Sequence, residues 1–195
     1  MRWSLLAVLL LVLFPAGALQ AAGSLSEGTY RSANKLFAEA RYEEAISLYR
    51  DVLANPPKNV TVADIHTKIG DSYFGMNAYK NALGAYRQAL EVQHPEKKPE
   101  SQYWVAFCTF LTGRDREAVE EFLKIPALYP DSGRWVSTAY YWAGRASERM
   151  GEKDQAAAYY KKAGGNGKSV QGRHAMKRAE KVKGSNTKSQ RPNPK

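Results

Sequence analysis

The chain has 195 residues and a formal net charge of +10, with 29 Lys and Arg against 19 Asp and Glu. The charge is concentrated at the C-terminus, because residues 161–195 hold 11 basic residues and one acid, Glu180, whereas residues 1–160 are neutral. A neutral body excludes a uniformly basic nucleic-acid-binding domain. The single cysteine excludes an internal disulfide framework, multi-cysteine zinc motifs and a Cys-x-x-Cys redox site.

Residues 1–22 have the features of a secretory signal peptide. Arg2 supplies a positive start, residues 5–14 form an unbroken apolar run, and small residues within 16–21 provide cleavage contexts. The run is shorter than the about 20 apolar residues that a spanning helix needs. We therefore expect export, to the periplasm of a Gram-negative bacterium. The alternative is an uncleaved N-terminal helix that anchors the protein to the envelope.

From residue 26 onward the chain repeats one helical pattern. Four alanines recur 36–38 residues apart, each followed by an aromatic residue four positions later and preceded, twelve positions earlier, by a small residue. This spacing lines one face of a helix and lets a neighbouring helix approach closely. The alanines are Ala45, Ala82, Ala118 and Ala156; the aromatics are Tyr49, Tyr86, Phe122 and Tyr160; the small residues are Ala33, Gly70, Ala106 and Gly144.

The pattern over residues 26–165 resembles the tetratricopeptide repeat (TPR) family. The resemblance implies an all-α, right-handed solenoid of about four antiparallel helix pairs. Helical periodicity, short loops and the lack of β-type alternation independently favour an all-α array whose repeats bury one another's faces. The predicted helices are 26–39, 42–54, 62–76, 79–92, 99–112, 115–125, 133–150 and 153–163.

Two positions within each repeat refine this prediction. The tryptophan that the family pattern expects early in each first helix is replaced by Thr29, His66, Gln102 and Tyr140, so the repeats are degenerate there. The turn between the paired helices holds Ala40, Asn77, Gly113 and Gly151. Asn and Gly suit a left-handed helix-ending conformation, so three of these four turns fit that geometry.

Residues 166–183 are expected to form a basic capping helix, and residues 184–195 a disordered basic tail. The cations of the capping helix and the tail have two interpretations. They solubilise the cap, or they contact an anionic envelope surface, where each is worth about 1 kcal/mol. Nucleic acid is disfavoured as a partner, since the tail lacks interleaved aromatic residues. The candidate contact residues are Lys177, Arg178, Lys181 and Lys183.

No catalytic constellation stands out, so the sequence predicts neither an enzyme nor a cofactor or metal site. The three histidines are far apart and lack a metal-ligand spacing. Cys108 lies among apolar residues and is predicted to be a buried, inert thiol. The stretch 167–169 resembles the end of a phosphate-binding loop, but the required first glycine is Lys162 and no strand precedes it.

The TPR resemblance implies a binding groove lined by the first helix of each repeat. The alternative is that half or more of these aromatic residues are repeat core. A lysine-containing carboxylate clamp is not supported, because none of the relevant positions holds lysine. The groove positions that carry over are Tyr30, Asn34, Phe37, Asp71, Phe74, Tyr103, Phe107, Tyr141 and Arg145.

The sequence therefore predicts an exported, non-catalytic TPR scaffold that binds a protein or peptide partner in the cell envelope. A rival interpretation rests on residues 140–160, which resemble the helical superhelix of lytic transglycosylases. No catalytic domain accompanies that stretch, so the rival is a wall-associated helical module.

Overall fold

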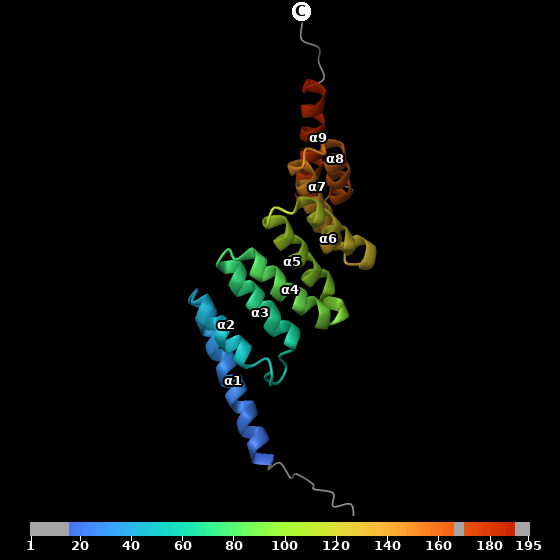
Figure 1. Ribbon diagram of the computed structural model, residues 1–195. Helices are drawn as coiled ribbons and strands as arrows, with labels where there is room; N and C mark the ends of the chain where they lie inside the picture. The colour runs from blue at the N-terminus through green and yellow to red at the C-terminus, as the bar shows by residue number, and fades with distance from the viewer. Residues whose placement is uncertain (1–15, 166–169, 190–195) are drawn as a thin grey trace, which may run out of the picture.

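The computed structural model describes residues 16–165 and 170–189, and the described residues contain helices but no strand. The helices pair in sequence order and stack into an elongated solenoid, with α1 and α9 at opposite ends (Figure 1). This confirms the predicted all-α solenoid of four helix pairs with a C-terminal cap. The helices are α1 (Ala16–Ala38), α2 (Tyr42–Asp51), α3 (Val62–Gly75), α4 (Tyr79–Val92), the short 3₁₀ helix η1 (Pro95–Lys97), α5 (Lys98–Leu111), α6 (Asp115–Leu128), α7 (Gly133–Arg149), α8 (Lys153–Gly164) and α9 (Val170–Ser189).

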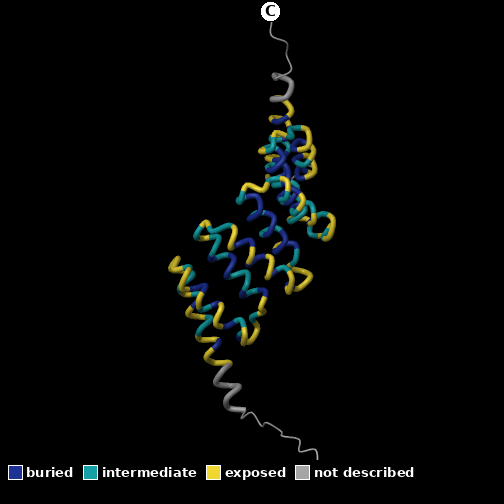
Figure 2. The backbone as a smooth tube through the Cα atoms, viewed as in Figure 1, coloured by how far each residue is buried: buried dark blue, intermediate teal, exposed yellow. Residues whose placement is uncertain are grey.

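Each repeat is closed by an aromatic ring of the second helix packed on a small residue of the first. The four rings are at most 1% exposed, as the repeat pattern predicts. A Cβ added to Gly70 would lie 2.7 Å from the Tyr86 ring, and one added to Gly144 would lie 2.8 Å from Tyr160. Buried residues therefore run along the helix contacts through the length of the stack, with exposed residues outside them (Figure 2).

All four turns inside the repeats adopt a left-handed backbone conformation. The predicted positions Asn77, Gly113 and Gly151 have φ values of 58°, 81° and 80°. Ala40 adopts the same conformation at 59°, although its Cβ makes this region unfavourable by about 1 kcal/mol. The shared hydrogen bonds explain why, since the next amide in each turn donates back to the final helical turn at 2.9–3.3 Å.

Helix α9 packs on α8 and closes the last apolar face. Its residues Ala179 and Val182 are buried against Ala156 and Tyr160. The helix continues to Ser189, so residues 184–189, predicted to be disordered, are helical. Once packing has nucleated a helix, each further residue extends it at little cost. Residues 166–169 of the predicted cap and 190–195 of the predicted tail lie outside the described residues.

The N-terminal boundary also differs from the prediction. Helix α1 begins at Ala16, so the last part of the predicted signal peptide, 16–22, is helical and continuous with the first repeat. Residues 1–15 lie outside the described part of the chain. Within the described residues, no helix combines the length and apolar character needed to cross a membrane.

Candidate partner-binding groove

Aromatic rings from α3, α5 and α7 form one contiguous set across repeats two to four. Neighbouring ring centroids lie 4.6–6.4 Å apart, in stacked, tilted and edge-on arrangements. Except for the buried Phe110, each ring is half-buried, so part of the set faces solvent. We call this set the aromatic stripe; it consists of Phe74, Tyr103, Trp104, Phe107, Phe110, Trp135 and Trp142.

Phe107 is the centre of the stripe. Its ring lies 4.6 Å from Trp142 on α7 and 6.1 Å from Phe74 on α3, so it joins three successive first helices. Tyr103 stacks on it at 5.6 Å, and burial raises the pKa of the Tyr103 hydroxyl to about 12. Three predicted groove residues, Phe74, Tyr103 and Phe107, therefore come together as expected.

The predicted groove residues of repeat one are separate from the stripe. The Tyr30 ring lies 5.7 Å from the buried Tyr49, and Phe37 meets Tyr42 edge-on at 5.6 Å. The Lys68 ammonium sits 5.1 Å from the centre of the Phe37 ring. Among the ring contacts of residues 16–165, none links Tyr30 or Phe37 to the stripe. The aromatic surface is therefore concentrated in the later repeats.

Asn34 and Asp71 are groove positions whose side chains serve the repeat core. The Tyr49 hydroxyl donates to Asn34 Oδ1, and the Tyr86 hydroxyl donates to Asp71 Oδ1, both at 2.8 Å. In repeat three Phe107 takes the position of Asn34 and Asp71, and Phe122 takes the position of Tyr49 and Tyr86. Both members of that pair are therefore apolar. These two polar residues thus anchor the second helix of their own repeat.

Tyr141 and Arg145 lie beside the stripe in repeat four. The Tyr141 ring lies 5.7 Å from Trp142 and 5.6 Å from the core residue Tyr160. The Arg145 guanidinium lies 5.7 Å from the centre of the Trp142 ring, within the range of a cation–π contact.

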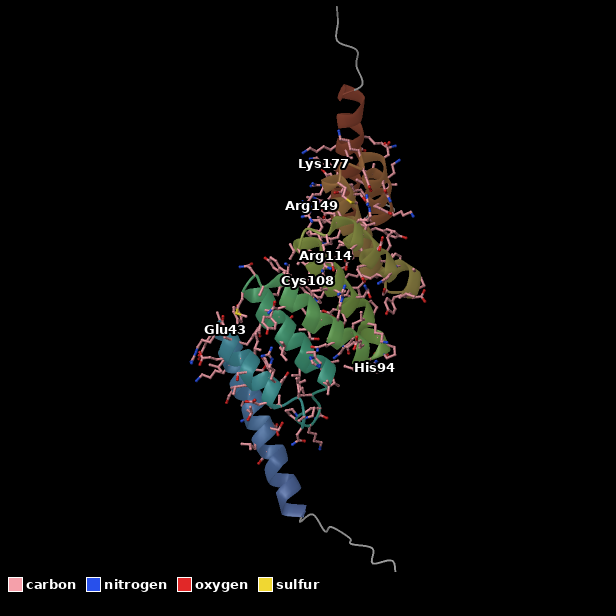
Figure 3. All side chains as sticks on the ribbon, in the orientation of Figure 1. Glu43, His94, Cys108, Arg114, Arg149 and Lys177 are labelled. Carbon is pink, nitrogen blue, oxygen red and sulfur yellow. The ribbon has the colours of Figure 1, made fainter. Side chains whose placement is uncertain are left out.

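Two further arginines of α7 cover rings of the stripe. Arg134 lies 4.5 Å above Trp135, and Arg149 lies 3.9 Å above Phe110 while pairing with Asp115 (Figure 3 labels Arg149). Arg134 and Arg145 have no carboxylate within 4.0 Å among the described residues. The rings are therefore bordered by two cations that lack an ion-pair partner within the described chain.

The three tryptophans of the stripe and Arg134 were not predicted from the sequence. A signal for two of them was present, because a Tyr-Trp dipeptide recurs 38 residues apart at 103–104 and 141–142. Trp135 had no such signal. It joins the stripe through a 5.2 Å ring contact with Tyr103, which only the packing of α7 on α5 creates.

A small pocket of about 160 Å³ lies beside the stripe, between α3 and α5. Most of its lining residues carry a polar group, and a Lys97–Asp64 ion pair of 3.0 Å lies at this site. The pocket therefore offers hydrogen-bonding groups next to the apolar rings. Its lining residues are Asp64, Thr67, Tyr86, Gln93, Lys97, Glu100, Ser101 and Trp104.

The predicted anionic-surface residues divide into two groups. Lys177, Lys181 and Lys183 are exposed on α9, and Figure 3 shows Lys177 near the C-terminal end of the molecule. Arg178 instead donates to Glu148 Oε2 and to the Tyr160 hydroxyl, both at 2.9 Å. Because its charge is used inside the cap, Arg178 is withdrawn from the predicted contact surface. Cys108 is buried as expected, and burial raises the pKa of its thiol to about 12.

Replacing Asp71 by Asn is expected to stabilise the protein at neutral pH, by up to roughly 1 kcal/mol. Burial raises the pKa of Asp71 above its ordinary 3.8, and the Tyr86 hydroxyl and Lys68 only partly oppose this. The folded state thus binds the proton more tightly than the unfolded state. The contribution of Asp71 to the free energy of unfolding is fully present below pH 3.8 and is lost as pH rises through the raised pKa of the folded state.

Asparagine keeps the acceptor for Tyr86, as Asn34 does for Tyr49, but has no charge. The difference between Asp71→Asn and the wild type should therefore shrink as pH falls to 3.8 and below. Urea unfolding at several pH values measures it. A variant that is less stable at neutral pH would show that the ionised carboxylate is favourable in place.

Comparison with known proteins agrees with this architecture. Residues 67–133 and 137–163 match sequence models described as tetratricopeptide repeat. No curated protein matches the chain. The solved apo structure of RapI is similar, with 16% identity over 84% of this chain and 64% of RapI, and a TM-score of 0.70. The chain thus spans less than two thirds of RapI.

Two other solved structures have the same fold. A tetratricopeptide repeat protein from Parabacteroides merdae is 18% identical over 86% of this chain and 63% of its own, with a TM-score of 0.68. YrrB, described as a TPR protein with an unusual peptide-binding site, is 21% identical over 82% of this chain and 78% of its own, with a TM-score of 0.61. With its repeat matches and its solenoid, this chain belongs to the tetratricopeptide repeat family, whose members are generally protein–protein interaction modules.

Proposed function

We propose that this protein is an exported, non-catalytic adaptor that binds a peptide or helix of a partner protein along the aromatic stripe. The observation that carries the proposal is the contiguity of half-buried rings across three first helices. Trp, Tyr and Arg are the residues that most often dominate binding energy at protein interfaces. The stripe supplies the first two, and Arg134 and Arg145 border it. The peptide-binding site described for YrrB is a further support.

The charge near the stripe favours a partner segment that combines apolar and acidic side chains. Residues 133–165 hold six Lys and Arg against three Asp and Glu, so repeat four is basic. Arg134 and Arg145 place their guanidinium groups beside the half-buried rings of Trp135 and Trp142, where an acidic side chain can reach them. Complementary charge of this kind mainly sets partner choice and association rate.

The double variant Arg134→Gln, Arg145→Gln is expected to lower partner recovery roughly tenfold, since two charge-assisted contacts are lost. Full-length protein serves as bait in a crosslinking pull-down from the native host, read by mass spectrometry. The control is Arg116→Gln, an exposed arginine of α6 away from the stripe. Equal recovery with both variants would refute the assignment. Retention on purified peptidoglycan without a protein partner would favour the wall-associated alternative.

Export and the exposed lysines of α9 form a second part of the proposal. The apolar run at 5–14 supports a cleaved signal peptide, and an uncleaved envelope anchor is the alternative. Lys177, Lys181 and Lys183 support electrostatic contact with an anionic envelope surface. Deleting α9 would be a poor test, because it would uncover Tyr160 and Ala156.

The triple variant Lys177→Gln, Lys181→Gln, Lys183→Gln tests this contact while leaving Arg178 in place. It is expected to leave the envelope fraction of the native host at clearly lower salt than the wild type, because each exposed cation contributes about 1 kcal/mol there. Mass spectrometry of the same fraction reports whether residues 1–22 are removed. Unchanged salt release would contradict the surface contact, and an intact Met1 would contradict cleavage.

A further inference from the structure

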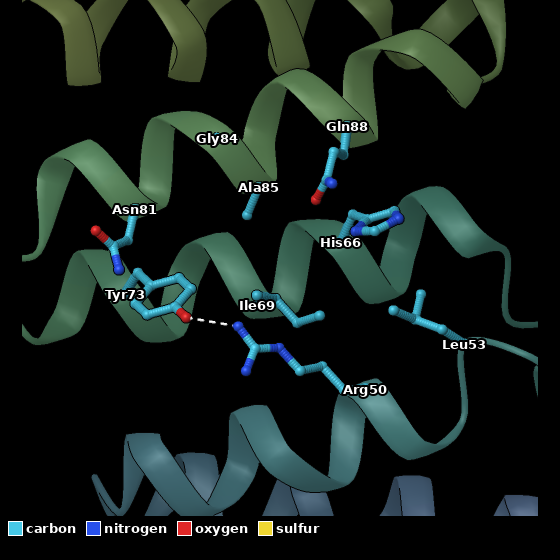
Figure 4. A pocket seen from close by; sticks show the side chains of 9 residues that line it. All are labelled: Arg50, Leu53, His66, Ile69, Tyr73, Asn81, Gly84, Ala85 and Gln88. Carbon is cyan, nitrogen blue, oxygen red and sulfur yellow. Dashed lines mark hydrogen bonds between the residues drawn. The ribbon is translucent and has the colours of Figure 1, made fainter.

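A trough of about 470 Å³ lies at the junction of repeats one and two, on the side of α3 away from Asp71 and Phe74. Figure 4 shows α3 as its floor, with α2 on one side and α4 on the other. This volume is within the range of ligand-binding clefts. Its lining residues are Arg50, Leu53, His66, Ile69, Tyr73, Asn81, Gly84, Ala85 and Gln88.

The next junction of the solenoid is filled by the chain itself. There the Arg87 guanidinium of α4 pairs with Glu117 Oε1 of α6 at 3.0 Å. Gln102 of α5 donates to the backbone oxygen of Glu121 at 3.1 Å and to its Oε2 at 2.8 Å. Two carboxylates of α6 thus satisfy an arginine of the preceding repeat and a polar residue of the same repeat.

The trough lacks both carboxylates at the equivalent positions. Arg50 stands where Arg87 stands one repeat later, but Asn81 replaces Glu117. His66 stands where Gln102 stands, but Ala85 replaces Glu121. Gly84 similarly replaces Glu120, so the α4 residues that line the trough are uncharged. Glu91, one turn further along α4, is exposed and acts electrostatically on His66.

The two polar side chains of the trough that correspond to Arg87 and Gln102 form no ion pair with a carboxylate among the described residues. His66 Nδ1 is shielded from solvent and has no hydrogen-bond partner among the described residues. The Arg50 guanidinium is exposed and donates to the Tyr73 hydroxyl at 2.8 Å, with no carboxylate within 4.0 Å among the described residues (Figure 4). A buried polar atom without a partner costs about 1–3 kcal/mol. The junction therefore holds an exposed arginine that no carboxylate of the described residues pairs with, next to a half-buried histidine.

We infer that the trough binds an acidic peptide segment of a partner protein. A carboxylate of the segment pairs with Arg50, taking the role that Glu117 has for Arg87. A second carboxylate or carbonyl oxygen accepts a hydrogen bond from the Nε2–H group of the half-buried His66 imidazole, as Glu121 does from Gln102. Apolar side chains of the segment lie over Ile69 in the floor. This site is distinct from the aromatic stripe and lies on a different face of α3.

Binding of a short fluorescein-labelled peptide of alternating Glu and Leu to the full-length protein tests this inference. Fluorescence anisotropy gives the affinity, and the imidazole NMR signals of His66 report its contact. We expect binding with a shift of the His66 signals, and no binding by the counterpart peptide with Gln in place of Glu. Arg50→Gln should weaken binding roughly tenfold through loss of a charge-assisted hydrogen bond. The matched control Arg87→Gln removes a guanidinium already paired with Glu117 and should leave binding unchanged.

A filling variant provides a second, independent test. Asn81→Glu copies Glu117 of α6 onto the exposed equivalent position of α4 and supplies Arg50 with a carboxylate from within the chain. It should abolish peptide binding without lowering stability, measured by urea unfolding. Equal binding by the Gln peptide, equal effects of Arg50→Gln and Arg87→Gln, or full binding by the filled variant would each overturn the inference. Competition by free glutamate at the peptide's own concentration would overturn the peptide assignment. Arg134→Gln with Arg145→Gln should leave this binding intact, which separates the trough from the stripe.

Discussion

Replacing Phe107 by Ala is expected to lower the free energy of unfolding by about 3 kcal/mol, as expected for removal of a largely packed aromatic ring. The ring contacts Phe74, Tyr103, Trp104, Phe110 and Trp142, which belong to three different helices. Its loss leaves a cavity where repeats two, three and four meet. Urea unfolding followed by far-UV circular dichroism measures the change.

Phe37→Ala is the matched control, because Phe37 is a half-buried groove residue in repeat one. Its ring meets Tyr42 and the Lys68 ammonium but no ring of the stripe. The expected loss is roughly 1 kcal/mol, the scale of a single aromatic pair. Equal losses for the two variants would show that the stripe adds no stability beyond ordinary ring burial. The comparison also guides binding studies, since a groove ring that holds repeats together cannot be removed to test partner contact alone.

Two mid-helix glycines are expected to respond oppositely to alanine. Gly70→Ala should lower stability by about 1–3 kcal/mol, because the new Cβ would lie 2.7 Å from the Tyr86 ring. That ring is 1% exposed and packs in a buried cluster, so it can move only by displacing its neighbours. Gly84→Ala should raise stability by about 0.5–1 kcal/mol, because nothing lies within 4 Å of its Cβ and alanine favours the helix.

Both substitutions bring the same gain in helix propensity, so the difference between them isolates the contact of α3 with α4. Parallel urea unfolding of the two variants measures it. A stabilising Gly70→Ala would show that the Tyr86 ring can make room for a Cβ, since in repeat one the equivalent Tyr49 belongs to the same buried cluster as Ala33. In that case the close approach would be a preference of repeat two and not a requirement.

The residues of the aromatic stripe were only partly predictable from the sequence. The TPR resemblance placed Phe74, Tyr103 and Phe107 in a groove lined by first helices, and the structure brings their rings together. The same resemblance placed Asn34 and Asp71 in that groove, but their side chains accept hydrogen bonds from the hydroxyls of Tyr49 and Tyr86. Spacing gives the face of a helix, whereas a hydrogen bond depends on the distance and rotamer across the helix pair.

The roles of the charged residues were likewise only partly predictable from the sequence. Counting residues located the excess of positive charge in the last part of the chain and identified Arg178 as a surface cation. Packing of α9 turns that guanidinium toward Glu148 and Tyr160. Conversely, nothing in the sequence of one repeat marks His66 or Arg50 as lacking partners. The trough is recognised only when two junctions are compared in space.

The sequence by itself determined the TPR architecture, because small and aromatic residues at a fixed spacing and turn-forming residues between helices act within one repeat. Those interactions are local, so their pattern can be recognised in the amino-acid sequence alone. The tertiary structure alone decided which groove residues are available, where Trp135 and the α7 arginines lie, and which junction is left without carboxylates. These features depend on the stacking of successive repeats, which sets distances between residues that no short sequence window contains.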